Sequence, residues 1–90
     1  MGYKIIVKKK AEKEIDKLDR KTRVLIVAFI ESLGKCKNPR EFKDAKMLKG
    51  IPGGMRWRIG KYRILGTVED EILTIEIFKV GPRSNVYRGL

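Results

Sequence analysis

Apolar residues near the start of the chain follow first a strand pattern and then a helical one. Residues 3–8 form a short, β-branched run flanked by charge, which is typical of a strand. From Lys9 to about Leu18, apolar residues recur at i, i+4 and i+7, the spacing of one helical face. They are Ala11, Ile15 and Leu18. We therefore expect a strand followed by an amphipathic helix.

A second helix is expected from about residue 20 to Gly34. Asp19 is suited to cap its start and Gly34 to end it. Its main apolar stripe is made of Ile26, Phe29, Ile30 and Leu33, and this stripe is widened by Val24, Leu25 and Ala28. Two interpretations remain open. Either the helix packs on both the sheet and the first helix, or part of its apolar surface is left for a partner.

Turn-forming residues divide the rest of the chain into short segments. Asn38-Pro39 and the Gly/Pro-rich residues 49–54 are breaks of this kind. Between them, one helical turn is expected from the spacing of Phe42, Ala45 and Leu48. Three strand-like runs follow, at 55–59, 62–68 and 72–80. Their short connections predict hairpins, so these runs should form an antiparallel meander.

The order of these elements predicts an α+β fold in one domain, residues 1–90. An N-terminal strand and a two-helix hairpin should pack on an antiparallel sheet of about four strands. In this arrangement the helices cover one face of the sheet, and the other face is free for function.

The chain is strongly basic throughout. It has 22 Lys and Arg against 11 Asp and Glu, a formal charge of +11. Residues 1–45 carry 13 positive and 7 negative charges and residues 46–90 carry 9 and 4, so the excess is not a basic tail. The most suitable partner for such a domain is a polyanion or an acidic protein.

Composition also excludes several kinds of site. The chain has no His and one Cys, Cys36, so a Cys/His metal site, a Ser–His triad and an internal disulfide are all excluded. We expect no metal and no cofactor. No apolar run approaches the roughly 20 residues that cross a bilayer, and no secretory signal is present, so a cytoplasmic protein without membrane contact is expected.

Arginines alternate with apolar residues along the predicted meander. Since side chains alternate between the faces of a strand, Arg56 and Arg58 should lie on one face, about 7 Å apart. Arg63 should join them from the next strand, together with Thr74, Glu76 and Phe78, opposite a core face that holds Leu73, Ile75 and Ile77. Arg83 and Tyr87 follow the last strand. Such a group could bind phosphate and stack a base, or the arginines could simply be solvated.

Three motifs in this order resemble the RelE/ParE toxin superfamily, over essentially the whole chain. They are Leu48-Lys49-Gly50, the run from Arg56 to Ile64 (RWRIGKYRI), and Val80-Gly81-Pro82-Arg83 with Val86-Tyr87. The resemblance implies a toxin of a type II toxin-antitoxin system. In the RelE branch, it implies a ribosome-dependent, metal-independent endoribonuclease that cleaves mRNA in the ribosomal A site.

The resemblance also implies a set of catalytic residues. By position they are Arg56, Arg58, Arg63, Arg83 and Tyr87. Relatives in the RelE branch have lysine, or His or Glu, where a general base is needed, whereas Arg56 and Arg58 do not lose a proton at neutral pH. Tyr87 and Glu76 remain as candidate bases, or the reaction depends on electrostatics alone.

Partners are implied in the same way. They are a cognate acidic, RelB-like antitoxin, which would convert a free monomer into a heteromer, and the ribosome with its mRNA. Basic residues expected to meet RNA or the ribosome are Lys8, Lys9, Lys10, Lys13, Lys17, Lys21 and Lys61. Two alternatives remain open: a ParE-like poison of DNA gyrase without nuclease activity, and a catalytically weak member that binds RNA or the antitoxin.

Overall fold

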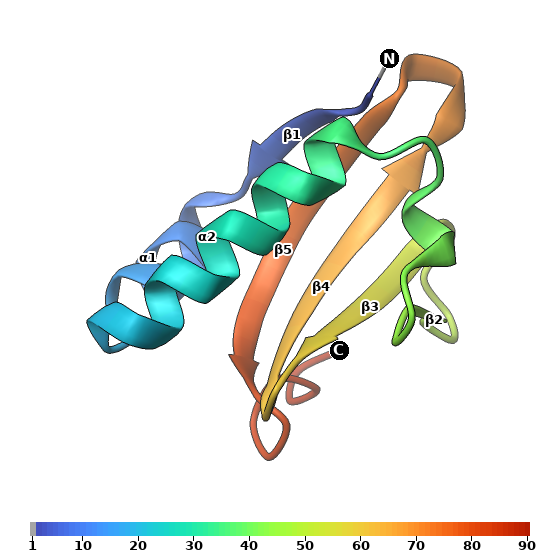
Figure 1. Ribbon diagram of the computed structural model, residues 1–90. Helices are drawn as coiled ribbons and strands as arrows, with labels where there is room; N and C mark the ends of the chain where they lie inside the picture. Colours follow the sequence, from blue (N-terminus) through green and yellow to red (C-terminus); the bar gives the residue numbers. More distant parts are fainter. Residues whose placement is uncertain (1) are drawn as a thin grey trace.

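The computed structural model describes residues 2–90 and confirms the expected strand, helix, helix and strands order (Figure 1). The helices are α1 (Lys9–Asp16) and α2 (Arg20–Lys35), with short 3-10 helices η1 (Pro39–Glu41) and η2 (Asp70–Ile72). The strands are β1 (Lys4–Val7), β2 (Lys46–Met47), β3 (Gly54–Ile59), β4 (Tyr62–Glu69) and β5 (Thr74–Pro82). No helix in residues 2–90 is long and apolar enough to span a membrane.

The strands form one sheet in the order β1-β5-β4-β3-β2. The predicted meander of β3, β4 and β5 is confirmed, since these strands pair antiparallel. The expectation of a purely antiparallel, roughly four-stranded sheet was wrong in two respects: β1 pairs parallel with β5, and the two-residue β2 adds a fifth strand. Hydrophobic periodicity reports which face of a strand is buried but not the direction of its neighbour. Strand β2 has only two residues, Lys46 and Met47, and both are exposed, so no alternation of buried and exposed positions marks it in the sequence.

Both helices cover the same face of the sheet, as expected (Figure 1). The buried cluster between them combines aliphatic residues from the helices with residues of alternate strand positions. These residues are Ala11, Ile15, Ile26, Ile30 and Leu33 on the helices and Met55, Trp57, Ile64, Val68, Ile75, Ile77 and Val80 on the sheet. We refer to this side as the helix face and to the opposite side as the open face.

Helix α2 begins as expected but ends differently. The Asp19 carboxylate accepts a hydrogen bond of 3.1 Å from the Thr22 backbone N–H, which caps the helix. Gly34 does not end the helix, which continues to Lys35. A Cβ on Gly34 would lie 3.2 Å from Cγ1 of Ile5, so the missing side chain allows β1 to approach closely. The stripe that includes Ile26 is buried, whereas the residues that widen it, Val24, Leu25 and Ala28, are exposed.

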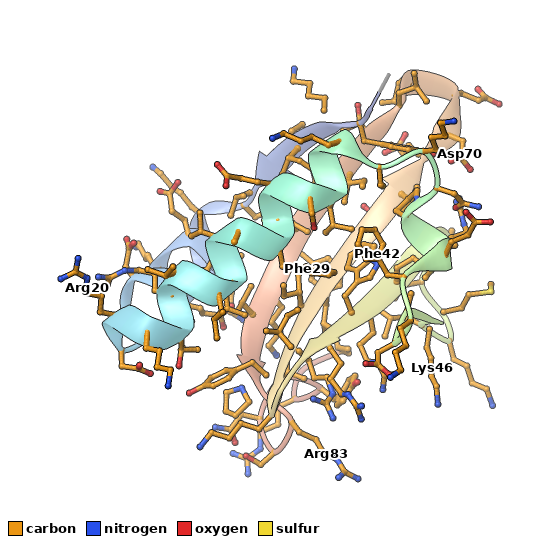
Figure 2. All side chains as sticks on the ribbon, in the orientation of Figure 1. Arg20, Phe29, Phe42, Lys46, Asp70 and Arg83 are labelled. Atoms are coloured by element: carbon orange, nitrogen blue, oxygen red, sulfur yellow. The ribbon has the colours of Figure 1, made fainter. Side chains whose placement is uncertain are left out.

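The loop between α2 and β3 lacks the helical turn expected over Phe42, Ala45 and Leu48. Instead, η1 brings the Pro39 carbonyl to the Trp57 indole N–H, which donates a hydrogen bond of 2.8 Å. Phe42 packs edge-on against Phe29 of α2, with ring centroids 5.1 Å apart (Figure 2). Phe42 and Ala45 both pack against the core cluster without a helix, so their spacing alone does not specify a helical turn.

A β-bulge between β4 and β5 changes which side chains share a face. The register shifts at Leu65/Gly66, so Leu65 pairs with Lys79 and Gly66 with Ile77, and Phe78 lies at the bulge without a partner. The bulge interrupts the strict alternation expected along this strand, since Lys79 and not Phe78 lies opposite Leu65. Leu73, predicted in the core, is exposed because it lies in the turn before β5 with a positive φ of 45°.

Helix α1 also protects the free edge of β5. The pairing of β1 with β5 ends at Val7 and Ile77. Beyond that point the Glu14 carboxylate accepts a hydrogen bond of 2.9 Å from the Val80 backbone N–H. A side chain thus replaces the strand that would otherwise satisfy this edge.

Candidate functional site

The open face carries the arginines of the central strands. In the β3–β4 register, Arg56 lies opposite Leu65 and Arg58 lies opposite Arg63, on the side away from Trp57 and Ile64 of the core. Three guanidinium groups therefore originate on one face, from two adjacent strands.

The last residues of the chain fold back over this face. Val86 is 1% exposed although it is not part of the main core, and Leu65 on the open face is fully buried. A Cβ on Gly81 would lie 3.8 Å from Cβ of Val86, and the Lys79 ammonium donates a hydrogen bond to the Arg88 carbonyl. In Figure 1 the chain ends behind β3 and β4, on the side opposite the helices. The neighbouring Tyr87 is exposed.

Arg63 is held by backbone carbonyls and not by an acid. One guanidinium nitrogen, Nη1, donates to the carbonyls of Gly60 (3.1 Å) and Tyr62 (3.2 Å) in the β3–β4 turn. The residue is 6% exposed, and its buried Nε has no partner in the described chain. No salt bridge in residues 2–90 involves Arg63. Its positive charge is therefore confined but not neutralised by a carboxylate.

Arg83 lies at the same turn but projects outward. Its backbone N–H donates to the Lys61 carbonyl at 2.9 Å, and a shallow hollow of about 390 Å³ is lined by Lys61, Pro82, Arg83 and Ser84. The Arg83 side chain points away from the sheet in Figure 2. The turn thus gathers Lys61, Arg63 and Arg83 at one end of the molecule.

Arg56 and Arg58 meet a residue that the sequence did not single out. Arg58 Nη2 lies 3.4 Å from Oδ1 of Asp44, and Arg56 Nη2 donates to the Asp44 backbone carbonyl at 3.3 Å. Asp44 belongs to the loop just before β2. Its position follows from the pairing of Lys46 with Arg56, and an isolated β2 of two residues is not recognisable in the sequence.

Glu76, a candidate base, is separated from the arginines. It pairs with Thr67, four residues along β4 from Arg63, which is on the order of 13 Å at the rise of a strand. Its carboxylate lies 3.9 Å from the Lys8 ammonium. Glu76 therefore does not lie beside the arginines as a base would need to, because it pairs with a lysine near the other edge of the sheet.

The lysines expected to meet RNA are all exposed. They flank or lie on α1 and the first turn of α2 (Lys8, Lys9, Lys10, Lys13, Lys17 and Lys21), and Lys61 lies in the β3–β4 turn. Within the described chain only Lys8 of this set forms an ion pair, with Glu76. Apart from Lys61, these lysines form a basic surface on and around α1, separate from the arginines of β3 and β4.

A second polar cluster joins the opposite end of the sheet. Arg40 donates two hydrogen bonds to the Asp70 carboxylate, at 3.2 and 2.8 Å, and the Tyr3 hydroxyl donates a third at 2.8 Å. The Arg40 and Tyr3 hydrogen bonds lower the pKa of Asp70, and the bond to Asp70 raises the pKa of Tyr3. This cluster ties η1, β1 and the β4–β5 connection together, so its role is structural.

Comparisons with proteins of known structure identify the fold. The chain resembles the toxin of the archaeal RelE–RelB complex from Pyrococcus horikoshii OT3, with 27% identity, a TM-score of 0.79, and 96% of this chain and 100% of the other covered. The RelBE2 toxin-antitoxin complex of Mycobacterium tuberculosis is 25% identical with a TM-score of 0.76, and the match covers 92% of this chain and 100% of the other. The RelB–RelE complex of Methanococcus jannaschii is 26% identical with a TM-score of 0.74, and the match covers 91% of this chain and 94% of the other. The two-helix, mixed-sheet structure is thus a RelE-like toxin fold.

Family comparison gives a more specific result. Residues 5–87 match the family described as the ParE toxin of type II toxin-antitoxin systems, parDE. No curated protein sequence matches the chain significantly. The chain belongs to this toxin family, within the RelE/ParE superfamily that the sequence motifs indicated.

Proposed function

We propose that this toxin is a ribosome-dependent endoribonuclease that inhibits translation by cleaving mRNA in the ribosomal A site. The observation that carries the proposal is the common origin of Arg56, Arg58 and Arg63 on the open face. Arg83 and Lys61 extend the positive charge at the β3–β4 turn. A phosphodiester chain crossing this end of the sheet would meet guanidinium groups from three segments of the protein.

The reaction needs little besides positioning and positive charge. The ribose 2′-oxygen attacks the adjacent phosphorus, the bond to the 5′-oxygen breaks, and the products are a 2′,3′-cyclic phosphate and a fragment with a 5′-hydroxyl. The substrate supplies its own nucleophile, so no Ser, Cys or His is required. The main contribution of the protein is stabilisation of the negative charge on the phosphorane-like transition state. Arg63 and Arg83 are assigned this role.

A protein base contributes little in this scheme. Arginine keeps its proton at neutral pH, and Glu76 lies far along the sheet with Lys8 beside it. Tyr87 is exposed on the segment that folds over the open face, where its ring can stack on a base and align the 2′-hydroxyl. The proposal therefore assigns catalysis to electrostatics, with Tyr87 as a positioning group.

Primer extension on ribosome-bound message tests this function. Wild type should produce cuts within A-site codons, and Arg83→Ala and Tyr87→Ala should each reduce them by about 10²-fold or more, as when a charge-stabilising or aligning group is removed. Arg88→Ala is the matched control, since it removes another exposed arginine from the same segment and should retain cleavage. Absence of wild-type cuts would reject the nuclease.

The alternative target is DNA gyrase. It is favoured by the family match, whose description names ParE. Under this alternative the arginines would bind a protein and not RNA. Gyrase–DNA complexes trapped by the toxin, together with an intact message on the ribosome, would establish it in place of the nuclease.

An antitoxin partner is proposed on two grounds. Solved relatives are RelB–RelE complexes, and α2 of this chain exposes the apolar residues Val24, Leu25 and Val27. Together with a net charge of +11, this surface suits an acidic amphipathic segment that covers the toxin.

A further inference from the structure

Asp44 contacts both arginines of β3. Its carboxylate Oδ1 lies 3.4 Å from Nη2 of Arg58, and its backbone carbonyl accepts a hydrogen bond of 3.3 Å from Nη2 of Arg56. Strand β2 pairs only with Arg56 and Met55, so the outer edge of β3 near Arg58 has no further strand beside it. One acidic residue therefore occupies the position where these two guanidinium groups would otherwise face solvent or a ligand.

The loop that carries Asp44 is fixed at several points. The Pro39 carbonyl is bound to the Trp57 indole, Arg40 is paired with Asp70, and Phe42 packs against Phe29. Immediately beside Asp44, the Ala45 N–H donates to the Phe42 carbonyl at 3.0 Å. The fold thus places the backbone of Asp44 next to the arginines.

The Asp44–Arg58 contact leaves most of the binding capacity of the guanidinium group unused. It joins one nitrogen and one oxygen at 3.4 Å, whereas strong charge-assisted hydrogen bonds are about 2.7–2.9 Å long and arginine binds phosphate through two parallel bonds. The Arg58 side chain is 47% exposed and that of Asp44 is 36% exposed. A phosphate group can therefore reach Arg58, and two-pronged binding would replace a single long contact.

We propose that Asp44 is a built-in counter-charge that occupies the phosphate position of Arg58 until an RNA phosphate displaces it. The carboxylate keeps Arg58 in place and lowers the affinity of the free toxin for polyanions. The displacing phosphate is that of RNA because this inference rests on the proposed function. Asp44 is accordingly a positioning residue that sets how tightly RNA binds at the edge of β3.

The test is a double-mutant cycle read by RNA binding. A short fluorescent single-stranded RNA with 2′-O-methyl riboses, which cannot be cleaved by 2′-hydroxyl attack, is titrated with wild type, Asp44→Asn, Arg58→Gln and the double variant at low salt. The Asp44→Asn change keeps the backbone carbonyl and removes only the charge. We expect D44N to tighten binding about three- to tenfold, R58Q to weaken it, and D44N to give no gain in the R58Q background.

A matched control separates this contact from net charge. Glu71 is exposed in η2, outside all three salt bridges of residues 2–90, and Glu71→Gln changes the net charge as D44N does. E71Q should change the affinity less than about twofold, since it touches neither arginine. If D44N binds no tighter than wild type, or if its gain persists in R58Q or is matched by E71Q, the inference is overturned.

Cleavage on the ribosome distinguishes this inference from the proposed function. Absence of A-site cuts together with intact coupling between Asp44 and Arg58 rejects the nuclease and supports the role of Asp44 in phosphate binding. Loss of coupling with normal A-site cuts rejects the role of Asp44 and leaves the nuclease in place.

Discussion

Arg58 and Arg63 lie directly opposite each other in the β3–β4 register, but their surroundings differ. Arg58 is half-exposed beside the Asp44 carboxylate, whereas Arg63 is 6% exposed and donates to backbone carbonyls. The carboxylate offsets part of the Arg58 charge, whereas the carbonyl dipoles orient the Arg63 guanidinium without offsetting its charge. Two arginines in equivalent sequence positions can therefore serve different purposes, one to adjust binding and the other to present charge to the reacting phosphate.

The contrast is tested most strongly by removing each charge in turn. Arg63→Met keeps the length of the side chain and should reduce A-site cleavage by about 10²- to 10³-fold, since it removes charge aimed at the transition state. Arg58→Gln should reduce it by about tenfold, equivalent to ~1.4 kcal/mol, because Arg58 is assigned to RNA binding and not to the transition state. Single-turnover cleavage on programmed ribosomes measures both, with the melting temperature of each variant as a check on folding. Equal losses would remove the distinction.

Trp57→Phe should destabilise the loop that contacts Arg58 and leave the surroundings of Arg63 unchanged. The change leaves the Pro39 carbonyl without its indole donor, a loss of about 1–3 kcal/mol in the free energy of unfolding. Urea denaturation measures this loss, and the NMR signals of the arginine Nε–H groups report where it acts. The Arg58 signal should shift and the Arg63 signal should not.

Tyr62→Phe serves as the control for this change. It removes a polar group from the neighbouring strand that has no hydrogen bond to the loop. An equal disturbance of Arg63 in Trp57→Phe would contradict the separation of the two regions.

The smallest effect concerns the Asp70 cluster, which fastens the loop on the Arg58 side. Arg40 and Tyr3 lower the pKa of Asp70 below its ordinary value of 3.8, so the carboxylate form is favoured by folding. The stability from this cluster should be fully present above that pKa and lost as the pH falls through the lower, folded value. Asp70→Asn should therefore flatten the acid limb of stability against pH, measured by thermal unfolding. Glu71→Gln should retain the loss of stability at acid pH. If Asp70→Asn retains it as well, the Asp70 cluster is not its source.

The parts of the fold that the sequence predicted are those governed by local pattern. The spacing of Ala11 and Ile15, the cap at Asp19 and the alternation around Trp57 each correspond to an observed element. The parallel pairing of β1 could not be obtained in this way, because it depends on two segments about 70 residues apart in a sheet. The exposure of Leu73 and the bulge at Phe78 follow from backbone geometry that no residue pattern records.

The candidate site shows the same division. Alternation along β3 and β4 was enough to predict that Arg56, Arg58 and Arg63 share a face. It gave no information on Asp44, because an acidic residue in a loop becomes a partner of Arg58 only through the tertiary structure. The roles of Arg83 and Tyr87 remain predictions that depend on the family motifs and on the cleavage experiment.

The way in which Val86 anchors the chain end has a consequence for how this toxin can vary. One buried valine and the bond from Lys79 to the Arg88 carbonyl hold a short segment with few apolar contacts. We expect such a segment to open at a lower free energy than the body of the protein. Substitutions of Val86 should therefore change the fraction of time that Tyr87 spends over the open face, while the stability of the rest of the molecule stays the same.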